Sequence, residues 1–259
     1  MTLTGRNITI RSGLALCGTI TVAVLLHFVW NLRHGYLSVE LRNVQIVALI
    51  GAAVTVVLGF LFSGVYARLF RRSPSIPVFF LTLFFLSITL DITKLAQLVV
   101  RTGSSQYFSL LVGRASIFGH IVGVMALFVA GLYAGGIRMQ RHGTVVLVGL
   151  LIAFSLSWLI PVDTSYLPDH LVYPAGVKAS FQSALLVFHL LAVLNFIQAA
   201  IVNQNPRMAV TALAVAFLAA GREILFFSVS PVWIVIGGGA VVVGGVVFTG
   251  QYYRDFLVS

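Results

Sequence analysis

Eight ionisable side chains stand inside long apolar stretches of this 259-residue sequence, where a charge without a partner is costly. Seven of them are Asp91, Lys94, Arg114, His120, His189, Arg222 and Glu223, and the eighth is His27. Ionisable groups in such stretches seldom face lipid, so they usually bind ligands, carry protons or pair with one another. We predict that the first seven form a ligand-binding site.

The spacing of three of these residues suggests a charge cluster. Asp91 and Lys94 are three residues apart and therefore share one face of a helix. Arg114 lies in the next apolar stretch, which runs antiparallel, at a comparable depth. We predict that Asp91 pairs with Arg114 and Lys94. The alternative is an ion pair between helices that only fixes their packing.

Arg222 and Glu223 are neighbours in the sequence and must have separate partners. Adjacent residues point about 100° apart on a helix, so the two side chains cannot pair on one face. Glu223 is expected to meet His189 or Lys94. Arg222 is expected to bind Asp91 or an anionic group of a ligand.

The seven candidates comprise three cations, two carboxylates and two histidines, which leaves one excess positive charge before any histidine is protonated. A pocket of this charge favours a carboxylate or phosphate group. We therefore predict an anionic small molecule or lipid as ligand. The alternative for Arg222 is that its side chain extends to the lipid headgroups.

Histidines raise the question of a cofactor. His120 and His189 could ligate a b-type haem from two helices. His27 and His189 with Asp91 could bind zinc, so His27, His120 and His189 are the metal candidates. The sequence contains no HExxH motif and no recognisable nucleophile elbow. We predict no cofactor and no catalytic residue, with haem and zinc as alternatives.

Composition shows which elements must position these residues. Hydrophobic residues make up 59% of the chain and charged residues 8%, whereas a soluble domain carries about a quarter of charged residues. We predict an all-α, polytopic transmembrane bundle that forms a single integral-membrane domain over residues 1–259. Its eight spans are expected at 12–32, 44–66, 77–100, 107–134, 144–161, 178–202, 208–229 and 232–250. All seven prolines fall at or between these ends, as expected for a residue that disrupts helix interiors.

The 16 Lys and Arg residues predict the orientation. More of them lie in the loops on the side of the two termini than in the loops opposite. The positive-inside rule therefore places both termini in the cytoplasm, in a bacterial inner membrane. If the last two spans did not both cross the membrane, seven spans would remain. The basic residues are scattered, which argues against nucleic-acid binding.

Small and aromatic residues predict packing. The fourth span carries Gly113, Ser116, Gly119, Gly123 and Gly131, and the last carries Gly237, Gly238, Gly239, Ala240, Gly244 and Gly245. Such faces allow helices to approach closely, and we expect them to pack inside the bundle. The third span is rich in Phe (Phe79, Phe80, Phe84, Phe85), and we expect these rings to face lipid.

Nearly all the ionisable candidates fall in the outer half of the predicted spans, at depths of about 8–20 Å from the helix rise. We therefore predict a membrane-embedded binding or sensing unit for a small molecule or lipid, which acts through a partner protein. A small transporter that uses the same residues is one alternative. An intramembrane enzyme or b-haem electron carrier is the other.

Overall fold

The protein is a bundle of long helices in the computed structural model, which describes residues 3–34, 43–72, 75–101, 106–137, 142–163, 171 and 178–257. The helices are α1 (Leu3–Arg33), α2 (Asn43–Arg72), α3 (Ile76–Thr89), α4 (Thr93–Arg101), α5 (Gln106–Ala134), α6 (His142–Leu159), α7 (Lys178–Val202), α8 (Pro206–Phe227) and α9 (Pro231–Leu257). Within these ranges, eight helical segments are long and apolar enough to cross a membrane. The predicted transmembrane bundle is confirmed.

The eight predicted spans match these segments closely. The third comprises α3, a 3₁₀ turn named η1 (Leu90–Ile92) and α4, in continuous succession. The largest difference in the bounds is at α1, which begins at Leu3 instead of residue 12. α8 and α9 are separate helices of 22 and 27 residues, joined by a short turn and with proline in the first turn of each. Each is long enough to span the bilayer, which supports eight spans over seven.

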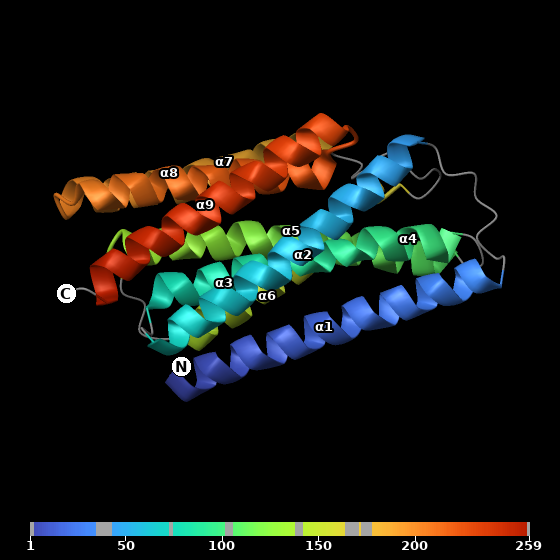
Figure 1. The fold of residues 1–259 in the computed structure, drawn as a ribbon, viewed down its shortest axis with the longest axis horizontal. Coiled ribbons are helices and arrows are strands. Elements are labelled where there is room, and N and C mark those ends of the chain that lie inside the picture. Colours follow the sequence, from blue (N-terminus) through green and yellow to red (C-terminus); the bar gives the residue numbers. More distant parts are fainter. Residues whose placement is uncertain are drawn as a thin grey trace.

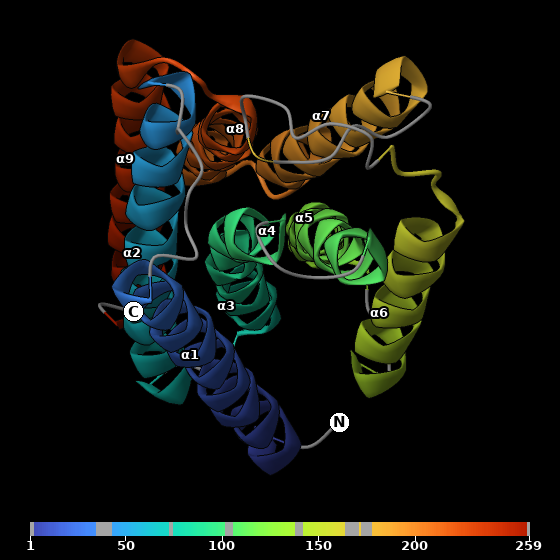
Figure 2. The ribbon, with the colours of Figure 1, turned by 90° about the vertical axis from the view of Figure 1, so that its right-hand side faces the viewer.

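The bundle has a central pair of helical segments and a periphery (Figure 1). α3 packs between α2 and α5, α7 packs against α5 and α8, and α8 packs along α9. α1 and α6 lie at the edge, and Figure 2 shows them on either side of α3 and α5. The N-terminal and C-terminal helix ends lie at the same end of the bundle (Figure 1). This end is called the terminal end below.

The prediction that the Phe-rich third span faces lipid is wrong. Phe79, Phe84 and Phe85 have no exposed surface, and Phe80 is 2% exposed. Phe84 and Phe85 pack edge to face, and Phe85 stacks on Phe62 of α2. Lipid tails and a helical core are equally apolar, so an apolar sequence alone does not show which of the two a ring contacts.

Glycines bring helices into close contact inside the bundle, as predicted. A Cβ atom on Gly221 of α8 would lie 2.8 Å from the carbonyl oxygen of Gly237 on α9. A Cβ on Gly244 would lie 2.6 Å from the carbonyl oxygen of Ala214. The backbones of α8 and α9 therefore touch at two levels, which larger residues would prevent.

Candidate ligand-binding site

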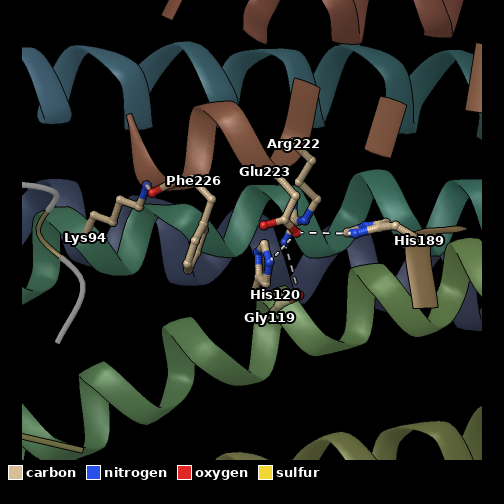
Figure 3. Close-up of polar contacts among 7 residues, drawn as sticks. All are labelled: Lys94, Gly119, His120, His189, Arg222, Glu223 and Phe226. Atoms are coloured by element: carbon tan, nitrogen blue, oxygen red, sulfur yellow. Dashed lines mark hydrogen bonds and ion pairs between the residues drawn. The ribbon is translucent and has the colours of Figure 1, made fainter. Parts of the chain in front are cut away.

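Six of the seven predicted site residues come together in the half of the bundle away from the terminal end. We call them the polar cluster: Asp91, Lys94, His120, His189, Arg222 and Glu223. They belong to η1, α4, α5, α7 and α8. Figure 3 shows five of them with Gly119 and Phe226. The third span, α5, α7 and α8 are thus linked through polar side chains.

Glu223 is the centre of the polar cluster. Its Oε1 accepts a hydrogen bond from His120 Nε2 at 2.8 Å and lies 3.5 Å from His189 Nδ1 (Figure 3). Its side chain is 29% exposed, whereas those of His120 and His189 are 0% and 6% exposed. The contact with His189 was predicted, and the shorter contact with His120 was not. One carboxylate oxygen therefore joins α8 to both α5 and α7.

Arg222 is fully enclosed beside Glu223. Its Nη2 donates to the Gly119 carbonyl oxygen of α5 at 3.3 Å, while Nε and Nη1 make no hydrogen bond to any described residue. A Cβ atom on Gly123 would lie 3.1 Å from Nε, so glycine makes room for the guanidinium. Asp91 and Glu223 both interact electrostatically with Arg222. The interaction with Asp91 was predicted, and that with Glu223 was not.

Lys94 has a partner that the sequence did not indicate. Its Nζ donates to the Phe226 carbonyl oxygen at 2.7 Å, and this is one of the last four carbonyls of α8. These carbonyls have no partner within their helix and carry partial negative charge. Nζ also lies 4.6 Å from the centre of the Phe226 ring, on which His120 packs with a 4.0 Å centroid separation. Lys94 therefore caps α8.

Asp91 lies in η1, the 3₁₀ turn that interrupts the third span. Hydroxyl groups on both sides donate to carbonyls three residues earlier: Ser87 to Phe84, Thr89 to Leu86 and Thr93 to Leu90. Such bonds compete with regular α-helical bonding and locally tighten or bend a helix. The Asp91 carboxylate interacts electrostatically with Lys94 and Arg222. Its Oδ2 has no hydrogen-bond partner among the described residues.

Gln97 belongs to this region and was missed by the sequence analysis. Its side chain is completely buried, and neither its oxygen nor its nitrogen has a hydrogen-bond partner in the described part of the chain. The signal that could have identified it is the three-residue spacing of Asp91, Lys94 and Gln97, which places them along one side of the third span.

The prediction that Arg114 joins Asp91 and Lys94 is wrong. The Arg114 guanidinium carbon lies 4.3 Å from the ring centre of Trp158 on α6. Gly123, which faces Arg222, is nine residues from Arg114 and therefore about 180° away around α5. Gly123 faces Ser87 of α3 as well as Arg222 of α8, so Arg114 points away from these two helices.

The zinc arrangement with His27 is also not formed. His27 has an exposed side chain on α1, at the edge of the bundle. Among the described residues, no group of three or more His, Cys, Asp or Glu side chains is placed to hold a metal ion. His120 and His189 both direct a nitrogen toward Glu223. A b-type haem between them stays an untested alternative.

Without Arg114, the polar cluster has two cations and two carboxylates beside two histidines. The excess positive charge predicted from the sequence therefore disappears when the histidines are neutral. Several buried polar atoms nevertheless lack hydrogen-bond partners among the described residues, including Nε and Nη1 of Arg222, Oδ2 of Asp91 and Nδ1 of His120. An unpaired buried group typically costs about 1–3 kcal/mol. The polar cluster can therefore form further hydrogen bonds with the donor and acceptor groups of a ligand.

Comparison with known proteins does not add a role to these residues. No protein-family model and no curated protein matches the sequence. A function has to be argued from the contacts of the polar cluster.

Proposed function

We propose that this chain is a membrane-embedded binding and sensing unit. A small polar ligand binds Glu223 and replaces its contacts with His120 and His189. One observation carries the proposal. The carboxylate that joins α8 to α5 and α7 keeps 29% of its side chain exposed, while the two histidines that contact it are buried. Glu223 is therefore the accessible member of the polar cluster.

Binding at Glu223 would change helix packing. A ligand group that donates a hydrogen bond to Oε1 competes with His120 and His189, which lie on α5 and α7. Loss of these contacts weakens the attachment of α8 to both helices. A ligand shifts such an equilibrium only through its different affinities for the two arrangements. The described residues form only the helical bundle, so the signal would pass to a partner protein.

The balanced charge of the polar cluster indicates which kinds of ligand it could bind. An anion would be held by the free Nε and Nη1 atoms of Arg222, as the sequence predicted. A small molecule with both donor and acceptor groups fits two cations and two carboxylates better. We also propose a bacterial cytoplasmic membrane with both termini in the cytoplasm, because the charge bias of the loops favours it.

The test compares Glu223→Gln with Asp163→Asn, which removes one carboxylate at an exposed position. Purified protein in nanodiscs is screened against zwitterionic amino acids and organic acids by thermal unfolding. A stabilising compound should lose its effect in Glu223→Gln and keep it in Asp163→Asn. Hydrogen exchange of α5 and α8 should increase in Glu223→Gln even without a compound. A shift that survives in Glu223→Gln, or unchanged exchange, would refute the proposal.

A small transporter is the second candidate, and the 3₁₀ interruption at Asp91 favours it. Broken helices with unpaired polar groups near the middle of the membrane mark substrate sites in many transporters. Asp91 Oδ2 and the Gln97 side chain provide such groups among the described residues. Uptake of a stabilising compound into proteoliposomes should then depend on Asp91. Equal flux in Asp91→Asn and Asp163→Asn would exclude this role for Asp91.

A further inference from the structure

A second region with binding potential lies on the side of the bundle away from α8. A groove of 340 Å³ runs between α1 and α6 and is floored by α3 and α5. Its volume is in the range of about 300–1,000 Å³ that is common for ligand sites. α1 and α6 are the two most exposed spans, since 11% of the residues in their most apolar stretches are buried. Figure 2 shows both helices at the edge of the bundle. The groove therefore lies where the bundle meets lipid.

The surface of the groove suits a saturated hydrocarbon chain. Most of its lining side chains are apolar, and its hydroxyl groups belong to Thr9, Ser12 and Ser87. Each hydroxyl already donates within its own helix, to the carbonyls of Gly5, Ile8 and Phe84 at 3.0, 2.6 and 2.6 Å. The walls of the groove are therefore apolar, and their hydroxyl groups already donate hydrogen bonds to backbone carbonyls.

The length of the groove matches one leaflet of a bilayer. It extends from Thr9 to Cys17 on α1 and from Phe80 to Leu90 on α3 and η1. At about 1.5 Å per residue, these stretches are roughly 12 and 15 Å long. The hydrocarbon core of a bilayer is about 30 Å thick, so one leaflet contributes about 15 Å. A chain from a single leaflet would fill the groove.

Polar groups stand at the terminal end of the groove. Arg6 precedes Thr9 by one helical turn, Tyr133 follows Val129 by one turn, and His142 precedes Val145 by one turn. Tyr133 and His142 share a hydrogen bond of 2.7 Å, and Arg6 interacts electrostatically with both.

Arg6 has free capacity for an anion at this end. Its Nε and Nη1 atoms are buried and make no hydrogen bond to the described residues. Its guanidinium carbon lies 5.4 Å from the centre of the Phe70 ring, which holds the cation in place. Guanidinium groups bind phosphate through two parallel hydrogen bonds. A negatively charged headgroup would complement this end.

We propose that the groove between α1 and α6 binds one anionic glycerophospholipid, with an acyl chain along α3 and α5 and the phosphate at Arg6. An occupant with an apolar chain about one leaflet long and a negative charge at the Arg6 end is a lipid. A non-helical segment of a partner protein would bring unpaired backbone polar groups, and this surface offers no free hydroxyl donor to pair them. The predicted orientation places Arg6 at the cytoplasmic leaflet, where anionic lipids are concentrated. This site is separate from Glu223.

The test is native mass spectrometry of the full chain, delipidated and incubated with dioleoylphosphatidylglycerol or dioleoylphosphatidylcholine. These lipids have the same chains, and only the first has a net charge. One phosphatidylglycerol molecule should remain bound, with phosphatidylcholine bound about tenfold more weakly. Arg6→Gln should weaken phosphatidylglycerol binding about tenfold, as expected for a lost charge-assisted contact. Arg11→Gln removes the same charge from an exposed position on α1 and should have no effect.

A second pair of variants tests the groove itself. Gly149 lines the groove and has no described atom within 4 Å of a Cβ position, so Gly149→Leu fills space without disturbing the fold. It should weaken binding of both lipids. Gly239→Leu adds the same side chain at an open, exposed position on α9 and should bind lipid normally. Equal binding of the two lipids, full binding by Gly149→Leu, or a lipid-free dimer abolished by Gly149→Leu would overturn the proposal.

Discussion

The third and fourth spans differ sharply from α1 and α6 in their surroundings although all four are similarly apolar. In the most apolar 18-residue windows, 78% of residues are buried in the third span and 67% in the fourth. The value is 11% in both α1 and α6. The buried spans carry the ionisable residues that join helices, whereas α1 and α6 border the lipid-facing groove. Whether an apolar span lies inside a membrane bundle or at its edge therefore depends on a few polar and small residues.

Four pairs of substitutions compare positions with packed or hydrogen-bonded side chains and positions without such contacts. The free energy of unfolding is measured in bicelles for each variant.

The largest effect is expected for Arg222→Met. It removes the cation beside Glu223 and leaves Asp91 with Lys94 alone, which should destabilise the protein by about 3–5 kcal/mol. Arg11→Met, at an exposed position on α1, should change stability by less than about 0.5 kcal/mol. Combining Arg222→Met with Asp91→Asn should recover part of the loss. If Arg222→Met is as stable as Arg11→Met, the polar cluster does not hold the central helices together.

Phe84→Ala should cost about 3 kcal/mol, because the ring is fully buried between helices and its removal leaves a cavity. Phe154 on α6 is 56% exposed. Phe154→Ala should cost less than about 1 kcal/mol, since lipid can fill the space that the ring leaves. Similar losses in both variants would show that α6 is as tightly packed as α3.

Gly123→Ala should cost about 1–3 kcal/mol, because the added methyl group would overlap the Ser87 hydroxyl and press on Arg222. Gly149→Ala on α6 meets open space and should be neutral or stabilising by up to about 1 kcal/mol. The comparison fails if the two alanines have the same effect.

The smallest effect is expected for Lys94→Met, at about 1–2 kcal/mol, because it removes the hydrogen bond to the α8 carboxyl end. Gln97→Met removes a buried amide that makes no hydrogen bond to the described residues. It should be neutral or stabilising, since no unpaired polar group remains. A larger loss for Gln97→Met than for Lys94→Met would show that the amide has a partner, such as a bound ligand.

Much of the fold followed from the sequence. The thickness of the bilayer requires about 20 apolar residues per helix, so runs of that length between polar loops and prolines identified all eight spans. The start of α1 was harder to predict, because its first turns mix polar and apolar residues. Hydropathy therefore does not show that these residues are helical.

The candidate site was predicted in part. Six of the seven residues lie in the polar cluster, because charges inside apolar helices must find partners wherever the fold allows. Arg114 lies outside the cluster because a similar depth in the membrane does not place two side chains on the same side of a helix. The capping of α8 by Lys94 could not be predicted, since a backbone carbonyl has no signature in the sequence.

The sequence by itself determined which segments cross the membrane and which side chains would be costly there, since both depend only on composition along the chain. The tertiary structure alone decided which apolar faces form the core, which face lipid, and which partner each charged group contacts. The physical reason is that lipid and protein interiors are equally apolar, so the choice between them depends on the close approach of glycines and on pairing between distant helices.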